Sequence, residues 1–133
     1  MKALDTNVLL RFLVDDDPKQ SKIVYEVFKG AEIHDTTFWV PLLVLIELVW
    51  VLESVYRIPR NEILDSIGEL LLMPILRFEG HETIQRFLFA AHGNRIDLSD
   101  ILIGCSAKTS GCDCVLTFDK KASKIELFEP ICG

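Results

Sequence analysis

The chain has 133 residues, half of them apolar, with a net charge of −6 at pH 7 and a pI near 5.0. This length is typical of one domain, so we expect residues 1–133 to form a single domain. The apolar content excludes a disordered chain and favours a large core, or a core with a subunit interface. The acidic balance excludes polyanion binding through overall charge, but carboxylates gathered around a divalent cation would still allow it.

The N-terminus contains no apolar segment of the signal-peptide kind, which predicts a cytoplasmic protein with reduced thiols. Cys112 and Cys114 are too close for a zinc-ribbon pair and have no partner pair. We therefore interpret Cys105, Cys112, Cys114 and Cys132 as small buried apolar residues, with a metal or redox role as the alternative. The apolar segment 38–52 is shorter than the ~20 residues that span a bilayer, so we expect a buried helix and no membrane association.

Short strand patterns alternate with helix patterns along the chain. We expect strands at 1–4, 33–40, 74–78, 112–118 and 125–128. We expect helices at 7–13, 19–28, 41–56, 61–72, 81–91 and 99–109. Prolines stand near three helix starts, and Gly30 is predicted to end the helix at 19–28. Alternating strands and helices indicate an α/β fold with a parallel sheet covered on both faces.

Two acids come directly after predicted strands. Asp5 follows the first strand, and Asp119 follows the fourth. The carboxyl ends of parallel strands form the edge where ligands bind, and in a doubly wound sheet these two strands lie side by side at the switch point. We expect Asp5 and Asp119 to flank that crevice, with helix capping as the alternative for each.

Glu47 interrupts the helix 41–56, in which no face is polar. A buried ionised carboxylate is strongly destabilising unless it is paired, protonated or bound to a metal ion. We therefore interpret Glu47 as an acid that points into a metal-binding crevice. The alternatives are an ion pair with Arg11 or Arg95, or a position on the helix surface.

Asp97 and Asp100 stand at N-cap and N3 spacing at the start of the helix 99–109. Capping and the helix dipole favour acids at these positions for structural reasons alone. We interpret Asp100 as a functional acid, whereas for Asp97 the capping and functional interpretations stay equally open. The apolar run that follows Asp100 is consistent with either.

Together, Asp5, Glu47, Asp100 and Asp119 form a set of acids at strand ends and on helices. If such carboxylates converge without a cation, they repel one another and raise one another's pKa, so a bound divalent ion is the physical means of keeping them ionised. Ligands that are all oxygen atoms favour Mg²⁺ or Mn²⁺ over zinc.

The chain resembles the PIN-domain ribonucleases, and among them the VapC-type toxins of bacterial and archaeal toxin–antitoxin pairs. The segments that carry the resemblance are LDTNVLLRFLVDDDP, VPLLVLIELVWVLES, DLSDILIGCSA and VLTFDKK, in this order and nearly end to end. The resemblance implies a three-layer α/β/α sandwich around a central parallel sheet, a homodimer, and metal-dependent endonucleolytic cleavage of RNA. It also implies a small VapB-like antitoxin whose C-terminal segment covers the catalytic groove.

The resemblance also implies roles for individual residues. The metal-binding and catalytic acids would be Asp5, Glu47, Asp100 and Asp119, with Asp97 as a neighbour of the site. Thr6, Asn7 and Thr117 would hydrogen-bond to the ligands. The expected chemistry is phosphodiester hydrolysis by a metal-activated water, which needs no Ser or His nucleophile.

Other charged residues are assigned from their positions. Arg11, Arg95, Lys120 and Lys121 are the basic residues nearest the acidic motifs, and we expect contacts with the RNA backbone or an ordinary solvated position. His34, His81 and His92 lie outside every acidic motif and are interpreted as surface or capping residues.

Three competing functions remain open. A phosphatase or phosphotransferase with an Asp nucleophile would need a second Asp two residues after Asp5, where the chain has Asn7. A phospho-accepting receiver domain would need an acidic pair after the first strand and a Lys near the site, and it would leave Glu47 unexplained. A PIN scaffold without catalysis would act only as a binding module.

Overall fold

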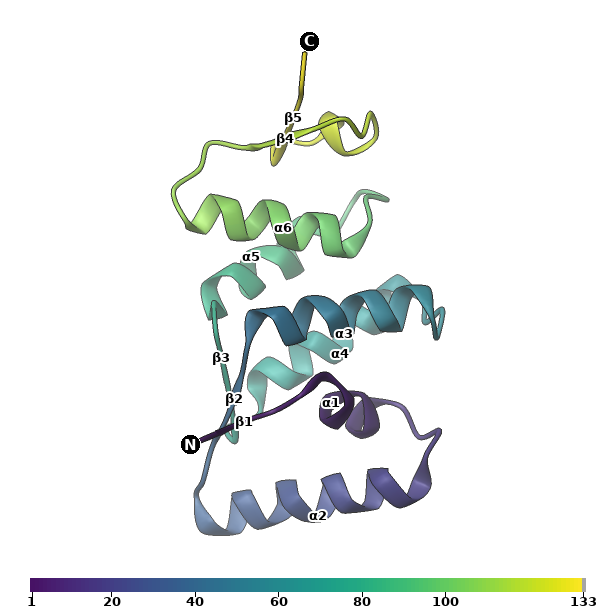
Figure 1. Ribbon diagram of the computed structural model, residues 1–133, viewed down its shortest axis with the longest axis vertical. Coiled ribbons are helices and arrows are strands. Elements are labelled where there is room, and N and C mark those ends of the chain that lie inside the picture. The colour runs from purple at the N-terminus through teal and green to yellow at the C-terminus, as the bar shows by residue number, and fades with distance from the viewer. Residues whose placement is uncertain (133) are drawn as a thin grey trace. The chain divides into compact units, whose positions relative to one another are not determined.

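The computed structural model describes residues 1–132, and the chain divides into two compact units. Unit 1 runs from Met1 to Glu79, and unit 2 begins at Gly80. Each unit contains a parallel β-ladder with helices, labelled in Figure 1. This confirms the predicted α/β class with parallel strands, while the single domain stays a prediction. No helix among residues 1–132 is long and apolar enough to cross a membrane.

Unit 1 alternates strands and helices. Its strands are β1 (Lys2–Ala3), β2 (Phe38–Val40) and β3 (Leu76–Phe78). Its helices are α1 (Thr6–Leu13), α2 (Pro18–His34), α3 (Leu42–Ser54) and α4 (Arg60–Leu72). The connections from β1 to α1 and from β2 to α3 are short, so both helices begin at the carboxyl edge of the sheet.

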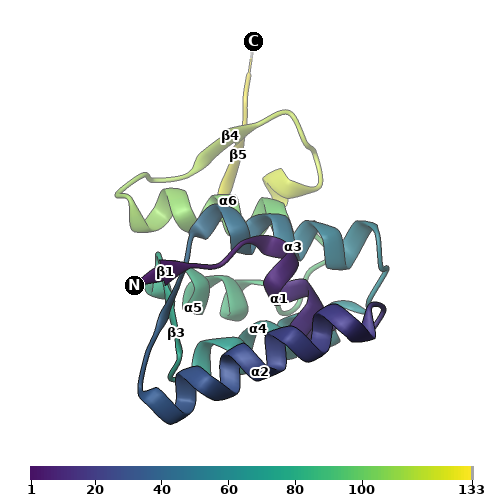
Figure 2. The same ribbon diagram turned by 60° about the horizontal axis from the view of Figure 1, so that its bottom comes forward.

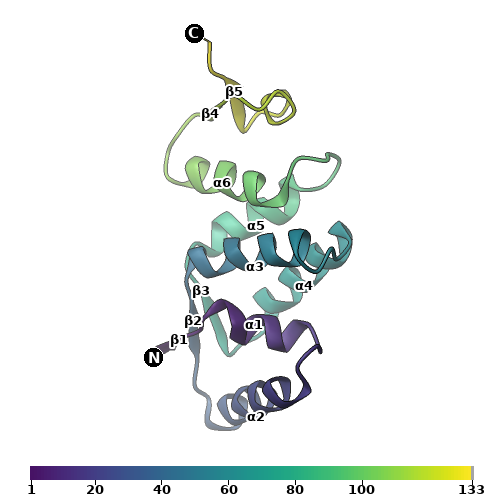
Figure 3. The same cartoon turned by 45° about the vertical axis from the view of Figure 1, so that its right-hand side comes forward.

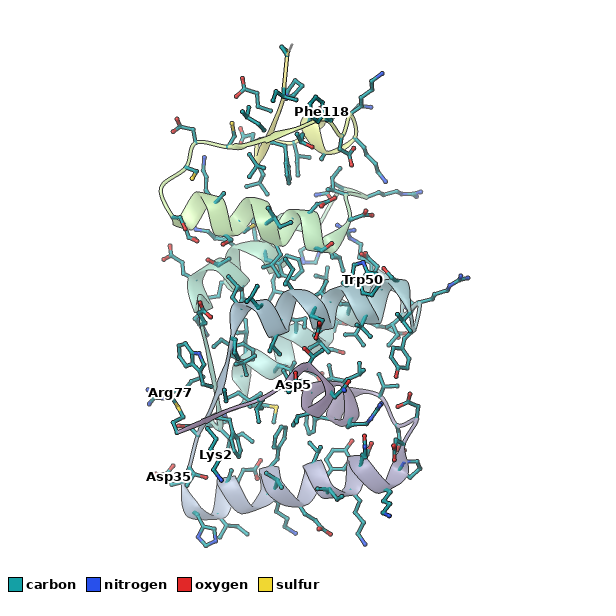
Figure 4. All side chains as sticks on the ribbon, viewed as in Figure 1. Lys2, Asp5, Asp35, Trp50, Arg77 and Phe118 are labelled. Atoms are coloured by element: carbon teal, nitrogen blue, oxygen red, sulfur yellow. The ribbon has the colours of Figure 1, made fainter. Side chains whose placement is uncertain are left out.

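The sheet of unit 1 is parallel, in the order β1, β2, β3. Val40 and Phe78 are buried on the face that packs against the helices, whereas Trp39 pairs in register with Arg77 on the exposed face. Figures 1 and 3 show α1 to α4 on one side of these strands, and Figure 4 shows Arg77 pointing away from them. Helices of unit 1 therefore cover one face of the sheet.

An aromatic cluster holds α2 against α1, and Figure 2 shows the two helices side by side. The ring of Phe12 in α1 lies 5.3 Å from that of Tyr25 and 5.1 Å from that of Phe28, both in α2. Phe28 in turn contacts Phe38 of β2 at 5.9 Å between ring centroids. These contacts join the two helices to the sheet, because aromatic side chains bury large apolar areas.

Unit 2 contains α5 (His81–Ala90), α6 (Leu98–Thr109), β4 (Val115–Thr117), the 3₁₀-helix η1 (Ala122–Lys124) and β5 (Phe128–Pro130). Strands β4 and β5 form a parallel pair. Helices α5 and α6 pack against each other through fully buried side chains that include Ile84, Phe87 and Ile101.

Gly104 lets α6 approach the segment that leads into β5. A Cβ atom at this position would lie 2.9 Å from Cβ of Leu127 and 3.3 Å from the Phe128 ring. Any larger residue would force the helix and this segment apart, so glycine is required for this close contact.

Most predicted elements are found, but two boundaries are wrong. The predicted strand 33–40 begins only at Phe38, because α2 continues through Gly30 to His34 and ends where Asp35 adopts a left-handed conformation with φ 54°. The last strand begins at Phe128, where it was predicted to end. In α2, Val24 and Phe28 face the core as the apolar spacing indicates, but the buried face continues through Ser21 and Ala31.

The cysteine interpretation is confirmed in part. Cys105 is buried in α6, whereas Cys112 and Cys132 are exposed and Cys114 is half-buried. All four are free thiols, as predicted. Burial raises the pKa of the Cys105 thiol. The expectation of burial was wrong for Cys112 and Cys132 because both lie outside the helices and strands.

Candidate active site

Asp5 occupies the junction between β1 and α1 that the sequence predicts. It has an extended backbone conformation, and its Oδ1 atom accepts a hydrogen bond of 2.7 Å from the backbone N–H of Thr6. The residue is exposed at the carboxyl edge of the sheet, where Figure 4 labels it. Asp5 therefore caps α1 and still presents its carboxylate to solvent, so the capping alternative and a ligand role are compatible at this position.

Glu47 lies in α3, the helix that follows β2 and packs against α1. The side chain is exposed, on a helix face that also carries Leu43 and Trp50, which are 80% and 52% exposed. The expectation of a buried Glu47 was wrong, because α3 has an exposed apolar face that its sequence does not mark. Arg11, one suggested partner of Glu47, forms an ion pair with Asp16 instead.

Glu79 is a further acid at this sheet edge, and the sequence interpretation missed it. It directly follows β3, and its Oε1 atom accepts a hydrogen bond of 3.0 Å from the backbone N–H of Leu42 at the start of α3. The signal was available, because an acid directly after a predicted strand is the same signal that identified Asp5 and Asp119. Glu79 fixes the start of α3, the helix that carries Glu47.

Unit 2 brings three predicted site acids near one another. Asp97 is the N-cap residue of α6, and Asp100 lies in the first turn of that helix. The Asp97 side chain makes no capping hydrogen bond, so the capping interpretation does not account for it. Asp119 follows β4, and its Oδ1 atom accepts hydrogen bonds from the backbone N–H groups of Lys121 at 2.8 Å and Ala122 at 3.1 Å.

The electrostatics of this group are unfavourable without a counter-charge. The pKa of Asp100 is raised, first because burial penalises its charged form and then because Asp97 and Asp119 repel its charge. A carboxylate whose neighbours are also acids is destabilised when ionised, and a cation placed among them would remove that cost. We call Asp97, Asp100 and Asp119 the unit 2 acids.

The three residues predicted to hydrogen-bond to the acids, Thr6, Asn7 and Thr117, differ in their contacts and burial. The Thr117 hydroxyl oxygen accepts a hydrogen bond of 2.9 Å from the backbone N–H of Asp119, so it fixes the backbone of that acid. Thr6 is buried, and its backbone N–H contacts the Asp5 carboxylate. Asn7 is exposed. Thr117 and Thr6 thus each hold an acid in position.

The predicted basic residues also differ in their surroundings. Arg11 donates through Nη1 to Asp16 at 2.7 Å and through Nε to Gln20 at 2.8 Å, so two of its nitrogen atoms are engaged within unit 1. Arg95, Lys120 and Lys121 are exposed. His34, His81 and His92 are exposed as well, which confirms their interpretation as surface residues.

The donor chemistry fits a hard divalent cation, but residues 1–132 do not form a ready binding group. The candidate ligands are all carboxylates, the ligand type that Mg²⁺ and Mn²⁺ prefer. However, no three His, Cys, Asp or Glu side chains in this part of the chain are gathered closely enough to hold a metal ion. Burial and then the charges of Asp97 and Asp119 raise the pKa of Asp100, so a cation beside this carboxylate would favour its ionised form.

The chain is an α/β protein with parallel strands and with acids after the strand ends, which is the edge where ligands bind in open α/β sheets. Comparison with known families matches residues 2–127 to the PIN domain. The chain therefore belongs to the PIN domain family, as the sequence motifs indicated. It is also 29% identical over 125 residues to a VapC ribonuclease of Aquifex aeolicus (strain VF5), a match that covers 94% of this chain and 92% of that protein.

Proposed function

We propose that this protein is a metal-dependent endoribonuclease that hydrolyses RNA phosphodiester bonds, and that it acts as the toxin of a VapBC-type toxin–antitoxin pair. The observation that carries the proposal is the placement of Asp97, Asp100 and Asp119 in a PIN-domain chain, where burial and then the charges of Asp97 and Asp119 raise the pKa of Asp100. The likeness to a VapC ribonuclease supports the assignment of the substrate as RNA.

The proposed ligands of Mg²⁺ or Mn²⁺ are Asp5, Glu47, Asp100 and Asp119, with Asp97 beside them. When bound, such an ion would lower the pKa of a water molecule bound to it. It would also neutralise charge on the phosphoryl oxygens. The proposal assigns these acids to one metal-dependent reaction, and it includes the prediction that the chain forms a single domain.

The chain's own residues prepare this chemistry. Thr117 fixes the backbone of Asp119, and the two N–H groups after it orient the Asp119 carboxylate. The Thr6 backbone N–H orients Asp5 from within α1. Carboxylates held in this way lose little freedom when a cation and a phosphate bind, so the site is partly preorganised.

RNA contacts are proposed for Arg95, Lys120 and Lys121, which are exposed cations close in sequence to the acids. Arg11 contributes less, because Asp16 and Gln20 already occupy two of its donors. Replacing Lys120 and Lys121 together with Ala should weaken RNA binding more than metal binding. Unchanged RNA affinity would remove them from the proposal.

The proposed partners are a VapB-like antitoxin and a second copy of the chain in a cytoplasmic complex. The VapC likeness supports the antitoxin. The high apolar content supports an interface between copies. Mass measurement of the purified chain tests the dimer, and co-expression with a neighbouring small gene product tests the antitoxin.

A second candidate is a PIN scaffold that binds a partner without cleaving RNA. The observation that favours it is that residues 1–132 contain no ready group of three metal-binding side chains. An Asp-nucleophile phosphatase is less well supported, because Asn7 stands where the second Asp would be needed.

One experiment separates these functions. The purified chain, Asp5→Asn and Glu47→Gln are incubated with structured RNA in Mg²⁺, in Mn²⁺ and in chelator. The nuclease proposal expects metal-dependent cleavage by the wild type alone. Equal cleavage by all three proteins would indicate a contaminant and contradict the proposal, and no cleavage by any of them would favour the scaffold.

A further inference from the structure

Unit 2 contains a cavity of about 600 Å³ that the proposed function leaves unused. It lies between α5 and α6, which are side by side in Figures 1 and 3, and the segment 125–127 that leads into β5. This volume is within the range of sites that bind small organic molecules, about 300–1,000 Å³. None of the described residues that line the cavity is one of the unit 2 acids, so the cavity is a feature of its own.

Apolar side chains line the cavity from three directions. Phe89 and Ala90 belong to α5, Cys105 belongs to α6, and Ile125 and Leu127 belong to the segment before β5. Cys105 is buried, whereas Phe89 is 84% exposed. A phenylalanine ring in water gives up the burial that normally stabilises it, so a molecule with an apolar body would gain free energy by covering this ring.

The antiparallel arrangement of α5 and α6 brings a cation from each helix to one end of the cavity. The hydroxyl oxygen of Thr83, near the start of α5, lies 2.5 Å from that of Thr109 at the end of α6. Arg86 is one turn after Thr83, Lys108 directly precedes Thr109, and both line the cavity. Burial raises the pKa of the Cys105 thiol, and the charge of Arg86 opposes this effect, which places that charge near the buried wall.

Both cations are able to bind an anion. Lys108 donates to the backbone carbonyl oxygen of Asp113 at 3.1 Å, which is an uncharged partner. Arg86 forms an ion pair of 3.3 Å with Glu82, but both side chains are more than half exposed, and such surface pairs contribute little free energy. Glu126 also lines the cavity. Among the described lining residues, two cations therefore stand against one acid, in a chain whose net charge is −6.

We propose that this cavity binds a small organic anion, a molecule with one acidic group on an apolar body. Arg86 and Lys108 bind the acidic group at one end, and the apolar side chains, Phe89 among them, cover the body. Ligand sites commonly have this composition, in which an apolar cavity carries a few polar groups that fix the orientation of the ligand. The inference is independent of the proposed ribonuclease, because it uses none of the candidate site acids.

Two fluorescent probes of similar shape test this site. Anilinonaphthalene sulfonate carries one anionic group on an aromatic body, and phenylnaphthylamine has the same body without a charge. Ala90→Phe fills the cavity from its apolar wall, Arg86→Gln and Lys108→Gln each remove one cation, and Glu126→Gln removes the acid. The matched control is Lys124→Gln, because Lys124 is an exposed cation of unit 2 that is not among the residues lining the cavity.

The wild type should bind both probes at one site. Arg86→Gln and Lys108→Gln should each weaken binding of the sulfonate about three- to tenfold and leave binding of the neutral probe unchanged, whereas Glu126→Gln should tighten the sulfonate about threefold. Ala90→Phe should lose both probes. Lys124→Gln should bind both like the wild type. Fluorescence titration measures each affinity, and circular dichroism checks that each variant is folded.

Three results would overturn the inference: no binding of the sulfonate by the wild type, sulfonate affinity unchanged in Arg86→Gln and Lys108→Gln, or an equal loss by Lys124→Gln. Retained binding of both probes by a folded Ala90→Phe would overturn it as well. Loosely packed chains bind more of the sulfonate, so weaker binding by a charge variant does not arise from unfolding. If Ala90→Phe does not fold, the charge variants at exposed positions still decide the outcome.

Discussion

Helices α1 and α6 both begin after an aspartate, and the two aspartates are used differently. Asp5 accepts a hydrogen bond from the first N–H of α1, whereas Asp97 makes no side-chain bond to α6 and instead adds to the charge that opposes ionisation of Asp100. Capping thus gives Asp5 a structural reason to be present and gives Asp97 none. An acid in an unfavourable electrostatic setting is the stronger candidate for function.

The acids at the starts of α1 and α6 should therefore differ in how their replacement changes stability and activity. At α1 the acid stabilises the fold, so a variant there should lose stability as well as activity. At α6 the partly buried carboxylate of Asp100 destabilises the fold when it is ionised and no cation is present, so a variant at Asp100 should lose activity and gain stability. The following predictions test this contrast, from the largest expected effect to the smallest.

Asp100→Asn should reduce metal-dependent RNA cleavage by at least about 100-fold, because loss of a ligand should exceed the effect of losing a residue that supports one. In chelator at pH 7 the same variant should melt at a higher temperature than the wild type, because it removes a charge that burial disfavours and that Asp97 and Asp119 repel. Cleavage rates and thermal unfolding measure the two effects.

The matched control is Asp113→Asn, which removes the same charge from an exposed position in unit 2. It should leave both cleavage and melting nearly unchanged. A lower melting temperature for Asp100→Asn in chelator would show that this carboxylate stabilises the fold, and would remove the contrast between α1 and α6.

Gly104→Ala should lower the free energy of unfolding by about 1–3 kcal/mol, because the added methyl group overpacks the contact between α6 and Leu127. Gly30→Ala in α2 is the control. Nothing lies within 4 Å of its added Cβ, so it should raise the free energy by about 0.5–1 kcal/mol. Urea denaturation measures the free energy of unfolding of both variants. If Gly104→Ala were more stable than the wild type, the contact between α6 and Leu127 would not be tightly packed.

Asp5→Ala should lower the free energy of unfolding by about 1 kcal/mol through loss of the α1 cap. Asp97→Ala should change it by only a few tenths of a kcal/mol, because no capping hydrogen bond is lost. Denaturation of the metal-free proteins compares them directly. Equal losses would mean that Asp97 caps α6 in solution.

The far end of α1 gives the smallest effect, which depends on pH. A hydrogen bond from Tyr56 of 2.6 Å, and then the charge of Arg11, hold the pKa of Asp16 below its usual value of 3.8. A lowered carboxyl pKa stabilises the fold above the unfolded-state pKa, and the contribution is lost as the pH falls through the folded-state value.

Asp16→Asn should therefore melt slightly below the wild type at pH 7, with a difference that disappears at about pH 2. Asp15→Asn, the neighbouring exposed acid, serves as the control and should follow the wild type at both values. A difference that persists at the lower pH would mean that the effect comes from packing and not from the charge of Asp16.

Sequence patterns located most elements, because proline, glycine and capping residues mark helix ends. They failed at Gly30, where the burial of Ala31 one residue later keeps α2 helical. They also failed for the burial of Glu47, because periodicity cannot identify the exposed face of a helix that is apolar all round. The acids at strand ends were found by position, and Glu79 was missed only because the same rule was not applied to β3.

The site could be predicted as a set of residues but not as an arrangement. Sequence order marks Asp97, Asp100 and Asp119 as candidates, and the structure adds that burial and the charges of the other two raise the pKa of Asp100. Hydrogen bonds such as that from the Asp119 N–H to Thr117 depend on the turn geometry, which residue identity does not specify. The cavity between α5 and α6 likewise emerges only from the folded chain.

The central claim is that Asp5 and Asp100 serve the same metal-dependent reaction, and a double-mutant cycle tests it most directly. Cleavage rates are measured for the wild type, Asp5→Asn, Asp100→Asn and the double variant in Mn²⁺. Because residues that act as a unit are not additive, the double variant should be no slower than the slower single variant. Losses that multiply in the double variant would contradict a shared role in that reaction.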